Sequence, residues 1–301
     1  MEVVLSAPRG FCAGVVRAVD VVELCLERFG SPIYVRREIV HNPHVVSDLK
    51  SKGAIFVEEL EELPEGQRVV FSAHGVSPAV WKHSRDRGLQ VVDATCPLVT
   101  KVHLEALKYA KEGYSVLLIG HRGHDEVIGT MGEAPEVSIL VEDIVRARTV
   151  QVLDPERVVV LTQTTLSVDD TSEIMRVLKE RFPDLISRND ICYATTNRQA
   201  AVKAITKEVD LVLVIGAQNS SNCNRLREVA EAEGVPAYLV NGPADIQRGW
   251  LDGVERVGIT SGASTPERLV EEVVASLGPA SVRNVEIVEE DVTFLLPRAL
   301  R

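Results

Sequence analysis

Short apolar runs alternate with amphipathic stretches along almost the whole chain. Runs such as VVFSAHG at residues 69–75 and VVVLTQTTLS at residues 158–167 begin with β-branched residues and end in a polar loop. The amphipathic stretches between them, such as HLEALKYAKEG at residues 103–113, are closed by a glycine in the position of a helix C-cap. Strands that alternate with helices of this length predict mainly parallel sheets built from βαβ units, an α/β fold.

The same succession of apolar run, polar loop and helix occurs three times. In each repeat a cysteine lies between the first run and the helix; these are Cys12, Cys96 and Cys192. A second run ends in a polar loop 28 or 29 residues after the cysteine, at His41, His124 and Ser220. A third run ends in a further polar loop, which holds His74, Thr164 and Ser264. Such agreement in spacing indicates three related structural units.

The repeat predicts three similar small α/β units around a pseudo-threefold axis with a central cavity. We expect units at residues 14–97, 98–193 and 194–281. The third has no cysteine strand after it, so we expect residues 1–13 to complete it and residues 282–301 to form a C-terminal tail. Because ligands bind at the carboxyl ends of strands in open α/β sheets, the cysteines and the polar loops are expected to converge.

The three cysteines have the chemistry of a metal site. Each is followed by a helix with a cation in its first turns, and these cations are Arg17, Lys101 and Arg198. A thiolate at a helix N-terminus is favoured by the helix dipole, which lowers its pKa and suits it to iron or zinc. Three thiolates leave one tetrahedral position open, as catalytic metal sites do. Zinc and a 4Fe-4S cluster with one free iron both fit, and the repeat disfavours three unrelated core cysteines.

The polar loops predict a pocket for an anionic ligand. Helix N-terminal amides bind phosphate groups, and histidine adds a donor that can become cationic near neutral pH. The candidate donors at these junctions are His41, His74, His124, Ser220, Ser221, Asn222 and Ser264. Taken singly, each of these residue types is more often a structural turn or cap residue. Their occurrence at equivalent positions of the repeat favours binding.

Glu126 is the candidate proton donor, two residues after His124. A carboxyl group in a closed pocket has a raised pKa and can act as a general acid. Thr164 can relay that proton or hydrogen-bond a substrate hydroxyl. The alternatives are a solvated glutamate at a helix start and a threonine that caps a turn.

Composition limits the possible partners. The net charge is −11 and no Lys/Arg run occurs, which argues against nucleic acid. The N-terminal residues lack the apolar core of a signal peptide, and no stretch of about 18 apolar residues suggests a membrane span. We therefore expect a cytoplasmic protein, in which free thiols persist, without a membrane partner.

Segments along nearly the whole chain resemble the 4-hydroxy-3-methylbut-2-enyl diphosphate reductase family, the last enzymes of the methylerythritol phosphate route to isoprenoids. The segments that carry the resemblance are APRGFCAGVVRAV, EIVHNPHVV, FSAHGVSP, DATCPLVTKVH, GHRGHDEVIGT, TQTTLSVDDT, DICYATTNRQ, GAQNSSN and SGASTPE. The resemblance implies a 4Fe-4S cluster held by Cys12, Cys96 and Cys192, whose fourth iron binds the substrate hydroxyl. It implies a diphosphate bound by His41, His74, His124, Ser220, Ser221, Asn222 and Ser264, with Glu126, Thr164 and His124 in catalysis.

The resemblance also implies reductive dehydroxylation of a small diphosphate to isopentenyl and dimethylallyl diphosphate, with electrons from a ferredoxin- or flavodoxin-type protein. Two other functions stay open from the residues alone. A zinc-dependent phosphohydrolase is disfavoured because such enzymes prefer histidine and carboxylate ligands to three thiolates. A non-catalytic iron-sulfur electron-transfer protein would need four ligands and no phosphate pocket. Cys223 stands where the family commonly has a small residue; it is either an inert residue at the start of a helix or an oxidation-sensitive thiol near the cluster, and we favour the inert interpretation.

Overall fold

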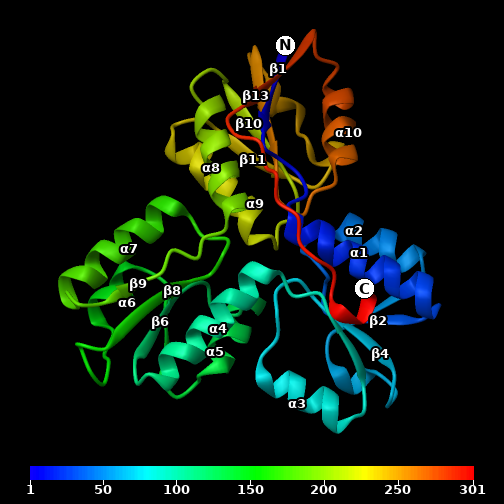
Figure 1. Cartoon of the computed structure of the whole chain (residues 1–301). Helices are drawn as coiled ribbons and strands as arrows, with labels where there is room; N and C mark the ends of the chain where they lie inside the picture. The colour runs from blue at the N-terminus through cyan, green and yellow to red at the C-terminus, as the bar shows by residue number, and fades with distance from the viewer. The chain divides into compact units, whose positions relative to one another are not determined.

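The computed structural model describes residues 1–301 and contains three β-sheets in which all strand pairs are parallel (Figure 1). This confirms the predicted α/β class. The chain divides into two compact units. Unit 1 comprises Met1–Val15, His41–Val45 and Cys192–Thr293, and unit 2 comprises Val16–Val40, Val46–Ile191 and Phe294–Arg301.

Unit 1 holds a five-stranded sheet of order β11-β10-β12-β1-β13. Its strands are β1 (Glu2–Ala7), β10 (Leu211–Ile215), β11 (Ala237–Val240), β12 (Arg256–Ser261) and β13 (Ser281–Glu286). The N-terminal strand β1 pairs with β12, with Glu2 opposite Arg256. Its other edge pairs with β13, so the chain after residue 281, expected to be a tail, starts within a sheet strand. Without β13, β1 would present a row of unpaired backbone groups at an open edge.

Both faces of this sheet are covered by helices, which explains the continuous apolar run of β10. Alternate side chains of a strand point to opposite faces. Val212 and Val214 pack with residues of α8 (Tyr193–Ile205) and α9 (Ser221–Ala232). Leu213 and its neighbours on the other face pack with α10 (Glu267–Leu277). Figure 1 shows α8 and α10 on either side of these strands.

Unit 2 holds two four-stranded sheets. The first has the order β3 (Ala54–Val57), β2 (Ile33–Arg36), β4 (Arg68–Phe71) and β5 (Gln90–Asp93). The second has the order β7 (Ser138–Val141), β6 (Ser115–Ile119), β8 (Val158–Thr162) and β9 (Ile186–Ser187). The other α-helices are α1 (Ala13–Phe29), α2 (Pro43–Ser51), α3 (Pro78–Asp86), α4 (Pro97–Lys111), α5 (Asp125–Glu133), α6 (Ile144–Thr149) and α7 (Val168–Arg181). Short 3₁₀ helices lie at Leu60–Glu62, Pro243–Asp245, Arg248–Leu251 and Arg298–Leu300.

The strand order repeats from sheet to sheet. In each, the strand before the second loop, the strand before the third loop and the strand before the cysteine are neighbours in that order: β2-β4-β5, β6-β8-β9 and β10-β12-β1. The polar loops therefore follow the carboxyl ends of adjacent parallel strands, where such sheets bind ligands. The boundaries near residues 97 and 193, the common axis and the central cavity stay predictions. None of the helices combines the length and the apolar character needed to cross a membrane.

Candidate functional site

Glu126 and Thr164 lie together in unit 2. The Thr164 backbone N–H donates to Oε1 of Glu126 at 2.6 Å, and the Thr164 hydroxyl donates to Oε2 at 3.0 Å. Glu126 is in the first turn of α5 and only 3% exposed, and Thr164 follows strand β8. Burial raises the pKa of Glu126 to about 7, the Thr164 hydrogen bonds oppose that rise, and the charge of Asp190 adds to it. The carboxyl group is therefore held close to equal protonation at neutral pH.

Two of the predicted histidines lie near the start of α5, the helix that carries Glu126. His124 is the N-cap of α5, and its Nδ1 accepts from the Glu126 backbone N–H at 3.2 Å. The His74 ring lies edge to face with the His124 ring, with centroids 6.0 Å apart. Ser72 Oγ lies 3.3 Å from His74 Nδ1. Unit 2 thus brings the two imidazoles close to each other, and one of them caps the helix that carries Glu126.

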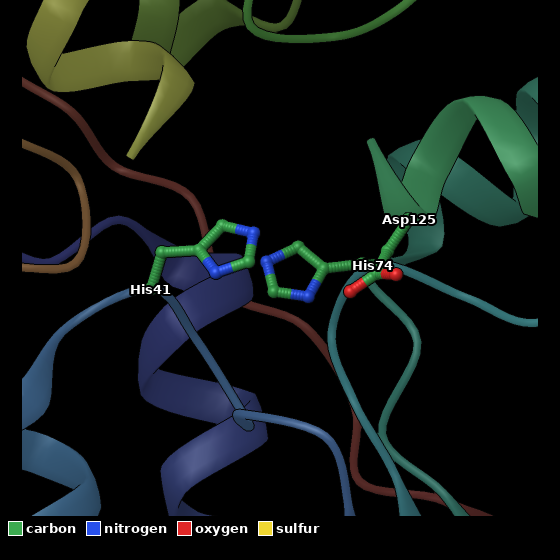
Figure 2. A group of neighbouring side chains, drawn as sticks. All are labelled: His41, His74 and Asp125. Carbon is green, nitrogen blue, oxygen red and sulfur yellow. The ribbon is translucent and has the colours of Figure 1, made fainter. Parts of the chain in front are cut away.

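Asp125 also lies at this site, although our reading of the sequence took Glu126 as the acidic residue of the loop. A carboxylate oxygen of Asp125 lies within 4.8 Å of a ring nitrogen of His74, and Figure 2 shows both side chains. Asp125 also pairs with Arg37, a non-glycine residue with a φ of 58° directly after strand β2. A left-handed backbone of this kind is strained and is common at functional sites. This pairing joins the first sheet of unit 2 to α5.

Cys96 is the N-cap of α4 in unit 2. Its backbone N–H donates to the Ala73 carbonyl at 2.9 Å, which ties the cysteine loop to the loop that carries His74. The cysteine is half-buried and is not part of a disulfide. Arg17 of α1 donates to the carbonyl of Thr95 at 2.9 Å, so the residue before the cysteine is also fixed.

Cys12 and Cys192 both belong to unit 1, and their neighbours in sequence are hydrogen-bonded. The backbone N–H of Ala13 donates to the Tyr193 hydroxyl at 3.1 Å. Cys192 is the N-cap of α8, where its Sγ accepts from the Thr195 backbone N–H at 3.4 Å. That sulfur already accepts a helix N-terminal hydrogen bond, which favours its thiolate form.

The predicted loops at His41 and Ser264 also meet in unit 1. Ser264 Oγ donates to the His41 carbonyl at 3.0 Å, and the preceding carbonyl, of Ala263, accepts from the Cys12 backbone N–H at 3.2 Å. Asn42 then caps α2, because its Oδ1 accepts from the His44 N–H at 3.0 Å. One turn at the end of β12 therefore holds both the cysteine loop and the histidine loop.

The third predicted donor group is the start of α9. Ser220 is the N-cap and accepts from the Cys223 backbone N–H at 3.4 Å. Asn222 is 4% exposed, and neither polar atom of its side-chain amide has a partner in the protein. A buried amide without a partner is costly, so this one is suited to a ligand. Ser221 is the first residue of the helix.

Within unit 2, then, the structure groups Cys96, His74, His124, Glu126 and Thr164 through the contacts above. Unit 1 contains Cys12, Cys192, His41, Ser220, Ser221, Asn222 and Ser264.

Comparison with known proteins decides the family. The LytB protein family matches residues 3–278. The chain belongs to the LytB family. A curated relative from Leifsonia xyli subsp. xyli, named 4-hydroxy-3-methylbut-2-enyl diphosphate reductase, is 57% identical over 100% of this chain and 91% of its own length. A relative of the same name from Pseudomonas aeruginosa (strain LESB58) is 53% identical over 100% of this chain and 99% of its own length.

Solved structures agree with this LytB assignment. The E-1-hydroxy-2-methyl-but-2-enyl-4-diphosphate reductase of Plasmodium falciparum is 39% identical, covers 100% of this chain and 96% of its own, and gives a TM-score of 0.96. A second structure, of (E)-4-hydroxy-3-methyl-but-2-enyl diphosphate reductase, is 34% identical over 92% of this chain and 99% of its own, with a TM-score of 0.65. Membership of the LytB family implies an iron-sulfur cofactor.

The structure of this LytB-family chain also adds a residue to which sequence reasoning gave no role. His103 of α4 is 8% exposed, and its Nδ1 lies 3.0 Å from a carboxylate oxygen of Glu133. Its ring fills the space beside two glycines: a Cβ on Gly75 would lie 3.1 Å from the ring, and one on Gly129 would lie 3.0 Å from it. Gly75 follows His74, and Gly129 lies one turn after Glu126. His103 could not be identified from its helical pattern, because its contacts come from distant segments.

Cys223 is fully buried beside Gly216 and Gly262, and burial raises the pKa of its thiol to about 11. Such a thiol carries little thiolate at neutral pH, which supports its interpretation as inert.

Proposed function

We propose that this LytB-family protein removes the hydroxyl group of 4-hydroxy-3-methylbut-2-enyl diphosphate reductively, giving isopentenyl and dimethylallyl diphosphate. The reaction consumes two electrons and two protons per substrate: one proton leaves with the hydroxyl oxygen as water, and the other forms the new C–H bond. A protein that catalyses it needs an anion site, an electron path and a group that is protonated near neutral pH. The observation that carries the proposal is Glu126, a buried carboxyl group with a pKa raised to about 7 beside His124.

The cysteines fit an iron-sulfur group. Cys12, Cys96 and Cys192 are half-buried and in no disulfide, and each lies directly before the first residue of a helix. Soft thiolate ligands are those that iron-sulfur clusters use. A 4Fe-4S cluster bound by these three thiolates would supply electrons one at a time and an open iron for the substrate hydroxyl.

The diphosphate would be bound by His41, His74, His124, Ser220, Ser221, Asn222 and Ser264. In unit 2 the His74 and His124 rings lie edge to face, so both can offer N–H groups to one anion. Arg37 neutralises Asp125 beside them, which lowers the repulsion that a carboxylate would exert on a diphosphate. In unit 1 the Asn222 amide has donor and acceptor groups that the protein leaves unused.

Glu126 would supply a proton to the departing hydroxyl group. Thr164 fixes the carboxyl group by two hydrogen bonds, so its position does not depend on solvent. The Thr164 hydroxyl can turn toward the substrate oxygen when Glu126 is protonated, because a protonated carboxyl group can itself donate. Low exposure excludes bulk water from this proton path.

We also propose that the electrons come from a ferredoxin- or flavodoxin-type protein. The reaction takes up two electrons in each turnover, so the protein requires an external electron donor. Because a 4Fe-4S cluster would accept these electrons one at a time, the donor must deliver them singly.

The test is turnover of the diphosphate substrate by holoenzyme prepared without oxygen, with a reduced dye as electron donor. We expect both diphosphate products, and loss of turnover by at least 100-fold in Glu126→Gln at unchanged iron content, in line with the usual contribution of a general acid. Glu136→Gln is the matched control, because Glu136 is exposed and the charge change is the same. Release of inorganic phosphate in place of these products would contradict the proposal and favour a phosphohydrolase.

A further inference from the structure

The cation that follows each cysteine reaches the loop in front of the next one. Arg17 lies five residues after Cys12, Lys101 five residues after Cys96, and Arg198 six residues after Cys192. We call Arg17, Lys101 and Arg198 the loop clamps. All three lie in the first turns of a helix, and none takes part in the proposed reaction.

The first two clamps act within unit 2. Arg17 donates to the Thr95 carbonyl at 2.9 Å, one residue before Cys96. Lys101 donates to Oδ1 of Asp190 at 3.0 Å, two residues before Cys192. The Asp190 side chain is only 1% exposed, and its Oδ2 also accepts from the Thr162 N–H at 3.4 Å. The short segment that leads to Cys192 is thereby fastened to α4, the helix that starts at Cys96.

The third clamp acts within unit 1 and completes the cycle. Arg198 is fully buried, and its guanidinium donates to the Gly10 carbonyl at 2.7 Å, two residues before Cys12. The same group pairs with Glu290 at 2.9 Å and so holds the C-terminal segment. Arg17 does likewise, because its Nε donates to the Leu295 carbonyl at 2.8 Å.

The three contacts run in chain order: helix one to loop two, helix two to loop three, and helix three to loop one. A general need for surface charge does not explain this order, since each cation bonds a loop at the same place, one or two residues before a cysteine. Arg17 is also close enough to Cys96 for the thiolate charge to act on the guanidinium. Cations and hydrogen bonds around the thiolate ligands affect how tightly a protein binds an iron-sulfur group. They also affect the reduction potential of that group.

We infer that Arg17, Lys101 and Arg198 are positioning residues for the iron-sulfur site, each holding the loop of the next cysteine and placing a positive charge in the first turns of the helix that follows a cysteine. The inference rests on the proposed function. It predicts that removing one clamp weakens the hold on iron and makes the bound group harder to reduce, because the reduced form carries the additional negative charge.

The test compares Arg17→Gln, Arg17→Lys and Lys101→Gln in anaerobically reconstituted holoenzyme. Arg181→Gln is the matched control. Arg181 also donates to two carbonyls, those of Ala147 and Val150 at 2.5 and 2.6 Å, and its replacement removes the same charge without touching a loop that leads to a cysteine. Arg198 is left unchanged, since its complete burial makes unfolding the expected result of replacing it.

Iron release to a chelator and the midpoint potential are the readouts. We expect Arg17→Gln and Lys101→Gln to release iron at least fivefold faster than the parent, with Arg181→Gln within about twofold of it. We expect the potential of both clamp variants to become more negative, by about 59 mV for each tenfold loss in stabilisation of the one-electron reduced form. Arg17→Lys keeps the charge, so its potential should stay near that of the parent.

Equal iron release by Arg17→Gln, Lys101→Gln and Arg181→Gln would overturn the inference, as would unchanged potentials in both clamp variants. A parent chain that takes up neither iron nor sulfide would contradict the proposed function instead, so the two failures are distinguishable.

Discussion

Thr164 holds both carboxylate oxygens of Glu126, one through its backbone N–H at 2.6 Å and the other through its hydroxyl at 3.0 Å. The two residues are 38 positions apart and follow neighbouring strands, β6 and β8, of one parallel sheet. Burial raises the pKa of Glu126 to about 7, and the two hydrogen bonds from Thr164 oppose that rise. The contact therefore helps to set the pH range in which the carboxyl group can donate a proton.

We predict that activity falls as the pH rises through about 7, because Glu126 must be protonated to act as an acid. The Thr164 hydroxyl lowers the pKa of Glu126, so Thr164→Val should raise that pKa and move the falling limb of the kcat/KM profile to higher pH. Thr164→Ser keeps a hydroxyl and should leave the limb in place. If the falling limb of the kcat/KM profile lies at the same pH in Thr164→Val as in the parent, Thr164 does not influence the pKa of the group that donates this proton.

A second prediction concerns stability. The folded pKa of Glu126 is raised from 4.5 to about 7, so the folded state binds the proton more tightly than the unfolded state does. This contribution to stability is fully present below pH 4.5 and is lost as the pH rises through 7. Glu126→Gln should therefore gain stability relative to the parent between pH 5 and 8, by up to roughly 3 kcal/mol. Urea unfolding of the parent and of Glu126→Gln at pH 5 and at pH 8 checks this, with Glu136→Gln as control. A difference in the free energy of unfolding between Glu126→Gln and the parent that is the same at both pH values would contradict the prediction.

The buried amide of Asn222 gives a third prediction. It has no protein partner, so Asn222→Ala should cost little stability. Its loss should weaken binding of inorganic pyrophosphate roughly 10-fold, the usual effect of one hydrogen bond to a charged group. Asn224→Ala is the contrasting variant, because the Asn224 amide is used within the protein, donating to the Gln218 and Ser220 carbonyls. Pyrophosphate affinity equal to that of the parent in Asn222→Ala would exclude this amide from the anion site.

The packing of His103 gives a fourth prediction. Alanine normally stabilises a helix by about 1 kcal/mol relative to glycine. At Gly129 its Cβ would lie 3.0 Å from the His103 ring, so we expect Gly129→Ala to destabilise the protein by about 1–3 kcal/mol instead. Adding His103→Ala removes the clash. The change in the free energy of unfolding of the double variant should therefore differ from the sum of the changes in the two single variants. Strict additivity would show that the ring and the helix do not constrain each other.

Much of this architecture is present in the sequence pattern. The spacing from Cys12 to His41 and from Cys96 to His124 reflects one helix and one strand that together span nearly the same number of residues, so it identifies equivalent loops. Glu126 and Thr164 follow strands of the same sheet, and their contact comes from parallel strands that end at one edge. Periodicity and turn chemistry are local properties, which a single sequence displays.

Other features depend on contacts that no local pattern records. The pairing of β13 with β1 joins residues about 280 positions apart and depends on the open edge of β1. The Arg37 pair with Asp125 joins two sheets of unit 2, and His103 fills a gap between two glycines of other segments. Each of these residues looks ordinary in its own segment, because its partner lies far away along the chain.

The decisive measurement is the content of iron and acid-labile sulfide per chain in protein purified without oxygen. We predict about four irons and four sulfides in each chain, lost together when Cys12, Cys96 or Cys192 is replaced by serine. One zinc ion per chain without sulfide would contradict the reductase assignment, because zinc cannot supply electrons for a reduction.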